Sequence, residues 1–215
     1  MKAILYFLLF FSFTGFSQSL VFKTGLNFTD YDYKNSKNIT NSNIDSSTGS
    51  FYEIGYIFEI RTGNFRKRAG CILCVSELNY TSSISLNQYN AKGGNNIDQY
   101  SWDTNYIGWN NYINYSFLSQ KQFLDISIKG GLGIATIING KQQMGGQIFD
   151  LKYNREFNGL WIYPTIGLNI RYDLFNQTYL SLGYDFTKLF SLNKNSESLS
   201  FNNKQLGFGI LININ

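Results

Sequence analysis

Two cysteines lie three residues apart, at Cys71 and Cys74, in the spacing of a C-x-x-C motif. On a helix or in a loop, this spacing suits a redox-active pair or two metal ligands. The neighbouring residues alternate as in a β-strand, where positions three apart face opposite sides and lie roughly 10 Å apart. That separation exceeds the reach of a disulfide. We therefore predict two unpaired thiols that fill small apolar spaces.

A second group with possible chemistry consists of eight ionisable residues on the small, polar side of an alternating pattern. They are Lys23, Glu53, Glu59, Glu77, Asp125, Lys129, Arg171 and Asp185. A turn centred near residues 64–65 would place Glu53 beside Glu77, and two facing carboxylates need a cation between them or a shared proton. We predict that Lys129 or Arg171 supplies this cation. Asp125 is expected near Arg171, lower in the same network.

Three interpretations of this charge network follow from its chemistry. Ions inside a narrow barrel need partners, so the network can simply plug and rigidify the interior, which is our main expectation. A gated path for ions is the second interpretation. A glycosidase-type carboxylate pair is the third, and it is weak because the lumen would hide the pair from a polysaccharide.

The composition excludes several function classes. The 215 residues include no His, so any enzyme that depends on a His base, nucleophile or metal ligand is ruled out. Two cysteines are too few for a disulfide-stapled mini-domain. The net charge of +4 is small and dispersed, which argues against nucleic acid as a partner. No phosphate-binding loop, EF-hand or zinc spacing is present, and we expect no metal and no cofactor.

The first 17 residues have the organisation of an export signal. Lys2 supplies a positive start, residues 3–13 are almost entirely apolar, and Gly15 and Ser17 are small residues before a cut at Gln18. The apolar run is too short for a spanning helix, which needs about 20 residues. We predict a signal peptide over residues 1–17 and a single β-barrel domain over residues 18–215.

Alternation with period two predicts eight strands in that domain. They cover residues 20–29, 51–60, 69–82, 106–117, 124–134, 162–172, 179–186 and 205–214. Most are about ten residues long, which is the length needed to cross a membrane as a tilted strand. Pro164 lies within the sixth of these segments, so we expect that strand to be irregular there.

The connections alternate between long and short. Long polar segments are predicted at residues 30–50, 83–101, 139–158 and 190–203, and short turns near 62–67, 118–122 and 175–177. This alternation is typical of an outer-membrane barrel, with both chain ends on the periplasmic side.

The direction of the larger apolar face decides between a membrane barrel and a soluble one. One face of each segment is rich in Ile, Leu, Phe and Tyr, whereas the other carries Gly, Ser, Asn and Thr. Small groups suit the interior of an eight-stranded barrel, and a continuous apolar exterior suits lipid. Six aromatic residues are predicted in the interfacial girdles: Trp109, Trp161, Tyr172, Phe175, Tyr184 and Phe186.

The segment from Gly49 to Ser83 carries short motifs that resemble a known family. Phe51, Gly55, Glu59-Ile60, Glu77-Leu78 and Tyr80 match the second hairpin of the OmpA/OmpX-like (PorT-like) outer-membrane β-barrels of Bacteroidota. The opening residues 23–28 and the hairpin of residues 167–189 are similar too. The resemblance implies an all-β, eight-stranded antiparallel up-and-down transmembrane barrel in the outer membrane, and it implies no particular activity.

We therefore expect a non-catalytic outer-membrane barrel with a packed polar lumen and four long extracellular loops. Its role would be structural or adhesive, or that of an accessory subunit of an envelope complex such as a secretion machine. A narrow pore for ions or small solutes is the first alternative, and a secreted soluble barrel that binds a small apolar ligand is the second. Expected partners are outer-membrane lipid, lipopolysaccharide and other envelope proteins, the lipopolysaccharide through loop cations: Lys34, Lys37, Lys92, Lys141, Lys152, Arg155 and Lys194.

Overall fold

A computed structural model describes residues 18–34, 44–60, 77–94, 99–120, 124–175, 177–193 and 198–214. They form nine strands: β1 (Gln18–Lys34), β2 (Ile44–Ile60), β3 (Glu77–Gly94), β4 (Gln99–Gln120), β5 (Leu124–Met144), β6 (Gln147–Asp150), β7 (Leu160–Phe175), β8 (Thr178–Ser191) and β9 (Ser198–Ile214). Within these ranges, no helix is long and apolar enough to cross a membrane.

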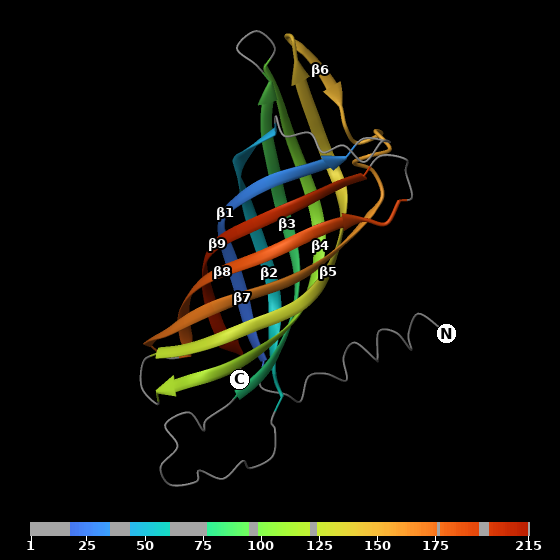
Figure 1. Ribbon diagram of the computed structural model, residues 1–215. Helices are drawn as coiled ribbons and strands as arrows, with labels where there is room; N and C mark the ends of the chain where they lie inside the picture. Colours follow the sequence, from blue (N-terminus) through green and yellow to red (C-terminus); the bar gives the residue numbers. More distant parts are fainter. Residues whose placement is uncertain are drawn as a thin grey trace, which may run out of the picture.

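Eight of the strands close into an antiparallel barrel (Figure 1). Each pairs with its neighbours along the chain, β5 pairs directly with β7, and β1 closes the circle by pairing with β9. The pairing that starts at Phe22 passes through all eight strands and returns to β1 at Asp32, ten residues further along. Such a stagger corresponds to strands tilted by roughly 40°. The prediction of an eight-stranded barrel is confirmed.

The two rims of the barrel differ. β1 begins and β9 ends at one of them, where Gln18 pairs with Ile214, and we call this the terminal rim. At the opposite rim β5 continues beyond the barrel and pairs with the short β6 (Figure 1). This hairpin, residues 141–150, is the arm, and the rim that carries it is the arm rim. Its turn uses Gly145 and Gly146, whose φ angles of 56° and 79° favour glycine.

Apolar side chains point outward in the half of the barrel next to the terminal rim. Leu168, Leu182 and Ile210 are 52%, 49% and 41% exposed, whereas Lys129 is only 1% exposed. A soluble barrel that binds an apolar ligand would show the opposite orientation, so that alternative is wrong. The direction predicted from the alternation is the observed one.

The outward apolar residues form a continuous band, which on several strands ends at a polar residue toward the arm rim. In β9, every second residue from Leu206 to Ile214 is apolar and exposed, and this stretch rises roughly 20–25 Å along a tilted barrel. That height matches the apolar band of a membrane barrel, about 25 Å. Toward the arm rim, the next outward residue on each of six strands is polar: Asp30, Ser50, Gln88, Asn105, Lys188 and Lys204.

Beyond these polar residues the polarity of the two faces is reversed on β1, β3 and β9, whereas β5, β7 and β8 keep exposed apolar side chains there, at Ile138, Leu160 and Phe190. Tyr31, Tyr89 and Phe201 point into the lumen and are buried, whereas their outward neighbours are polar. The strands are therefore longer than predicted, because residues expected in long loops belong to strands. More than half of each predicted loop at residues 30–50, 83–101 and 190–203 belongs to strands, so the prediction of four long loops is wrong for these three connections.

Three other predictions have different outcomes. Trp161 is fully buried in the lumen, so its assignment to an outer girdle is wrong, whereas Trp109 is 52% exposed on the outer face. Pro164 lies on the outward face of β7, and the pairing of β7 with β8 omits residues 163 and 164. Residues 1–17 and both cysteines lie outside the described residues.

Candidate functional site in the barrel lumen

An ion pair crosses the middle of the lumen. The ammonium of Lys129 on β5 contacts the carboxylate of Asp185 on β8, and both side chains are at least nine-tenths buried. Between them on β7 lies Gly167, which pairs with both residues. A Cβ at this glycine would lie 1.9 Å from Oδ1 of Asp185, so only glycine lets the two side chains meet across an intervening strand. The Lys129 ammonium also lies 4.3 Å from the ring centre of Tyr112.

A second ion pair lies closer to the terminal rim. Asp125 on β5 and Arg171 on β7 are paired directly in register, and Nη2 of Arg171 is 2.8 Å from Oδ2 of Asp125. The hydroxyl of Ser116 donates a hydrogen bond to the same carboxylate. Both ionic side chains are about one-fifth exposed, which is consistent with their position near the rim.

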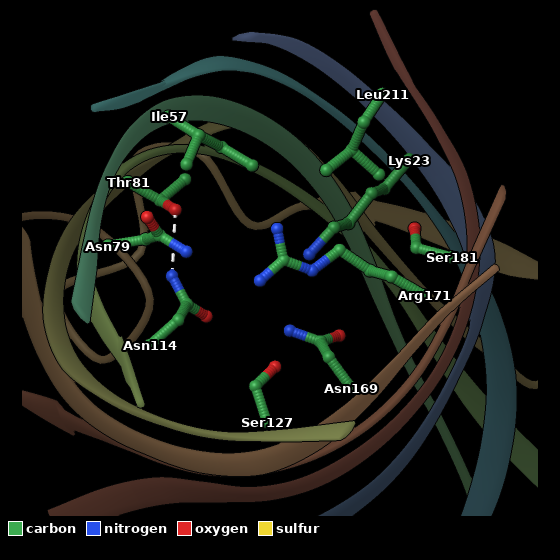
Figure 2. Close-up of a pocket in the computed structure, with 10 residues that line it drawn as sticks. All are labelled: Lys23, Ile57, Asn79, Thr81, Asn114, Ser127, Asn169, Arg171, Ser181 and Leu211. Carbon is green, nitrogen blue, oxygen red and sulfur yellow. Dashed lines mark hydrogen bonds between the residues drawn. The ribbon is translucent and has the colours of Figure 1, made fainter. Parts of the chain in front are cut away.

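Lys23 on β1 and Glu53 on β2 lie opposite each other. The Glu53 carboxylate is buried and accepts a hydrogen bond of 2.6 Å from the hydroxyl of Ser83. Lys23 extends instead into a small chamber toward the terminal rim, where Figure 2 shows it beside Arg171. The chamber has a volume of about 10 Å³, enough for a single water molecule. Amide and hydroxyl side chains line most of it, namely Asn79, Thr81, Asn114, Ser127, Asn169 and Ser181.

The predicted pairing of Glu53 with Glu77 is wrong. Ile60 pairs with Leu78, and this register places Glu53 opposite Ser85, eight residues along β3 from Glu77. The two residues therefore belong to different levels of the barrel, and Glu77 is the first residue of β3 at the terminal rim. Glu59, near the end of β2, is exposed at the same rim.

Amide side chains fill the lumen above the ion pairs. The amide of Asn203 donates a hydrogen bond of 3.1 Å to Oδ1 of Asn27, and the amide of Gln205 donates one of 3.0 Å to the same oxygen. Gln205 also reaches Oδ1 of Asn87 at 3.3 Å. These residues come from β1, β3 and β9, so the hydrogen bonds tie together strands from both ends of the chain.

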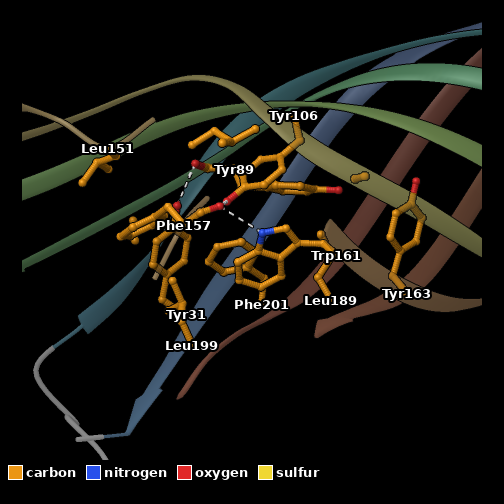
Figure 3. Close-up of a cluster of buried hydrophobic side chains, with 13 residues drawn as sticks. Tyr31, Tyr89, Tyr106, Leu151, Phe157, Trp161, Tyr163, Leu189, Leu199 and Phe201 are labelled. Carbon is orange, nitrogen blue, oxygen red and sulfur yellow. Dashed lines mark hydrogen bonds between the residues drawn. The ribbon is translucent and has the colours of Figure 1, made fainter. Parts of the chain in front are cut away.

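An aromatic plug closes the lumen near the arm rim (Figure 3). We define it as six buried residues: Tyr31, Tyr89, Tyr106, Phe157, Trp161 and Phe201. The rings of Trp161 and Phe201 are stacked with 4.7 Å between their centres, and Tyr31 lies 4.4 Å from Phe201 by the same measure. The indole nitrogen of Trp161 donates a hydrogen bond of 3.0 Å to the carbonyl oxygen of Phe157. The lumen is thus polar between the aromatic plug and a small buried apolar cluster near the terminal rim, formed by Val21, Ile57 and Leu211. The expectation of a packed polar lumen is wrong at both ends.

Phe157 does not belong to a strand. It lies in the connection between β6 and β7, and this segment also buries Leu151 against the plug. The sequence analysis did not identify the plug residues. One signal could have revealed them. Along a strand, the apolar residues move from the outward to the inward positions, while the alternation with period two continues.

The described residues contain no arrangement suited to metal catalysis. No three of their His, Cys, Asp or Glu side chains gather as metal ligands would. The buried ionic groups contact each other or a hydroxyl, with Lys23 facing the small chamber.

Comparisons with known proteins give structural similarity only. No protein-family model matches the chain, and no curated protein matches it. Among solved structures, Neisserial surface protein A is similar at 10% identity over 91% of this chain and 97% of that chain, with a TM-score of 0.49. Ail of Yersinia pestis has 11% identity over 91% and 99%, with a TM-score of 0.39. OprG of Pseudomonas aeruginosa has 10% identity over 93% and 98%, with a TM-score of 0.45. The likeness concerns the barrel fold.

Proposed function

We propose that this chain is an integral outer-membrane barrel whose filled lumen is structural and whose arm rim is presented to partners outside the cell. The observation that carries the proposal is the continuous band of exposed apolar side chains around a closed sheet. A soluble monomer does not tolerate such a band, whereas lipid requires it. Closure also leaves the barrel wall without an unpaired strand edge, which a hydrocarbon environment demands.

The arm rim is proposed to face the cell exterior. In bacterial outer-membrane barrels the longer elements are extracellular and the short turns are periplasmic. This orientation places both ends of the domain in the periplasm, consistent with export through a cleaved signal over residues 1–17. The motif formed by Phe51, Gly55, Glu59-Ile60, Glu77-Leu78 and Tyr80 supports membership of the PorT-like barrels of Bacteroidota.

The lumen is proposed to be neither a pore nor a catalytic site. The aromatic plug fills the interior at one end, and the Lys129–Asp185 ion pair crosses its middle. Interiors of eight-stranded barrels are just wide enough for side chains to fill. An ion or solute that passed through the lumen would have to displace both the aromatic plug and the ion pair.

Planar-bilayer recordings test the filled lumen. The purified chain, folded into bilayers, is expected to give no discrete channel openings between about −150 and +150 mV. Heat-dependent migration of the same preparation on gels serves as the control that the barrel is folded. Reproducible openings that are altered in Lys129→Ala would contradict the structural role and support the narrow pore.

The arm is the element we propose for contact with another protein. It projects beyond the barrel, and among the described strands β6 pairs only with β5, so one edge of β6 is open. Ile148 and Phe149 on β6 are 68% and 42% exposed, and Tyr153 just after it is 76% exposed. An open strand edge with exposed apolar side chains is suited to bind an extended segment of a partner.

Crosslinking in intact cells tests this contact. We expect wild-type protein, recovered in mild detergent, to carry a defined partner that the double variant Ile148→Asp/Phe149→Asp loses at least tenfold. The matched control is Ser198→Asp/Ser200→Asp, which adds the same charge on another strand of the same rim. Equal recovery from both variants would remove the arm as the contact surface.

A further inference from the structure

Two lysines lie on neighbouring strands, at the edge of the apolar band nearer the arm rim. Lys188 on β8 and Lys204 on β9 both point outward and are exposed. Lys188 pairs with Asn202, and Lys204 pairs with Phe186, so the two lysines are diagonal neighbours across one ladder. Such positions lie about 7–8 Å apart, within the reach of one multivalent anion between two long side chains.

Within the described residues, neither ammonium forms an ion pair with a carboxylate. Asp30 on β1 pairs with Asn202 and is a diagonal neighbour of Lys204, but it forms no ion pair with either lysine. The only charge-related contact of Lys188 in the described structure is with the ring of Phe190, 5.4 Å from the ammonium to the ring centre. Two positive charges at this edge are therefore available to an external anion.

An apolar hollow lies directly next to the lysines. It has a volume of about 330 Å³, and Pro164, Ile166 and Phe186 line its apolar part. Proline has no N–H to donate, and the ladder between β7 and β8 is interrupted at residues 163 and 164. The hollow lies at this interruption. Ile166 and Phe186 are 62% and 48% exposed, and both belong to the apolar band. The hollow thus joins the cationic edge to the surface that faces hydrocarbon.

We propose that Lys188 and Lys204 bind the phosphate group of a phosphorylated outer-leaflet glycolipid, with one of its acyl chains in the hollow at Pro164. This inference rests on the proposed outer-membrane location and orientation. The vertical order of the site matches such a lipid, because the cations lie at the level of headgroups and the apolar hollow lies at the level of acyl chains. A free phosphate ion would use the cations only, whereas the lipid uses both parts.

The test measures binding of diphosphoryl lipid A to the full chain folded in phosphatidylcholine nanodiscs. Native mass spectrometry counts the lipid A molecules that stay bound, over a titration. We expect Lys188→Gln/Lys204→Gln to bind about thirtyfold more weakly than wild type, since each lysine near a charged membrane surface contributes about fivefold. The matched control is Lys141→Gln/Lys152→Gln, which removes two exposed charges that belong to the loop cations suggested by the sequence as lipopolysaccharide contacts. The proposed site assigns this contact to Lys188 and Lys204 instead, so the control is expected to bind as wild type does.

Two further measurements distinguish a phosphorylated lipid from a free phosphate ion as the ligand. Lipid A without phosphates is expected to bind wild type as weakly as the double variant binds the phosphorylated form. Inorganic phosphate at the same concentrations is expected not to compete. Equal binding by wild type and Lys188→Gln/Lys204→Gln would overturn the site, and so would full competition by inorganic phosphate. A chain that does not fold into nanodiscs at all would instead refute the proposed membrane location.

Discussion

Replacing Lys129 with methionine is expected to lower the free energy of unfolding by about 3–5 kcal/mol. The substitution leaves the Asp185 carboxylate buried in the lumen without its cation, and removing one member of a buried ion pair costs this much. Methionine keeps most of the length of the side chain, so the loss reports charge more than volume. Urea titration of the chain in detergent micelles, followed by circular dichroism, measures the change.

Two variants separate the ion pair from other effects. Lys129→Met combined with Asp185→Leu removes both charges and is expected to recover most of the lost stability. Lys152→Met removes an exposed lysine beyond the barrel and should change the free energy of unfolding by less than about 0.5 kcal/mol. If Lys129→Met were as stable as Lys152→Met, the ion pair would have no structural role.

Replacing Trp161 with alanine is expected to destabilise the barrel by about 3–5 kcal/mol. Its ring is fully buried and stacked on Phe201, so the change leaves a large cavity in the plug. It also removes the indole donor that reaches the carbonyl oxygen of Phe157. The same urea titration measures the loss.

An aromatic residue outside the barrel provides the control. Tyr153 is 76% exposed, and Tyr153→Ala is expected to change the free energy of unfolding by less than about 0.5 kcal/mol. Similar losses for Trp161→Ala and Tyr153→Ala would show that the plug does not stabilise the barrel. A large loss for Trp161→Ala together with new channel openings would identify the plug as the seal of the lumen.

The sequence predicts the half of the barrel next to the terminal rim well, because the contrast between lipid outside and a narrow lumen inside dominates there. Outside the barrel, lipid selects Ile, Leu, Phe and Tyr, and inside, the narrow lumen selects small and polar residues. Gly167 shows this second requirement at a single position, since any larger side chain would collide with Asp185. Asp125 and Arg171, expected to be close, form an ion pair with 2.8 Å between their charged atoms.

The half of the barrel next to the arm rim is predicted as loops, because the contrast between its inner and outer faces has the opposite sign. On β1, β3 and β9 the outer face beyond the band is polar, whereas the lumen at that level is filled with aromatic rings. In β1 the outward Phe28 is followed by Asp30, and the inward Asn27 is followed by Thr29 and Tyr31. Alternation continues without interruption, and only its polarity changes at the membrane edge.

The Glu53–Glu77 pairing was wrong for a different reason. Residues 69–75 are apolar enough to resemble a strand, which suggested a tight turn near residue 65. In the structure β3 begins at Glu77, so the register moves by eight residues. Register depends on where a turn ends, and the alternation of side chains does not fix that position.

The composition of the aromatic plug has a consequence for how the chain folds. Five of its six rings come from β1, β3, β4, β7 and β9, so neighbours such as Tyr31 and Phe201 are brought together by the first and last strands. The high sequence separation of these contacts implies slow, cooperative assembly, since long chain loops must close before the rings meet. Until β9 arrives, an open sheet leaves these rings unburied, so an incomplete barrel exposes an aromatic surface that the closed barrel hides.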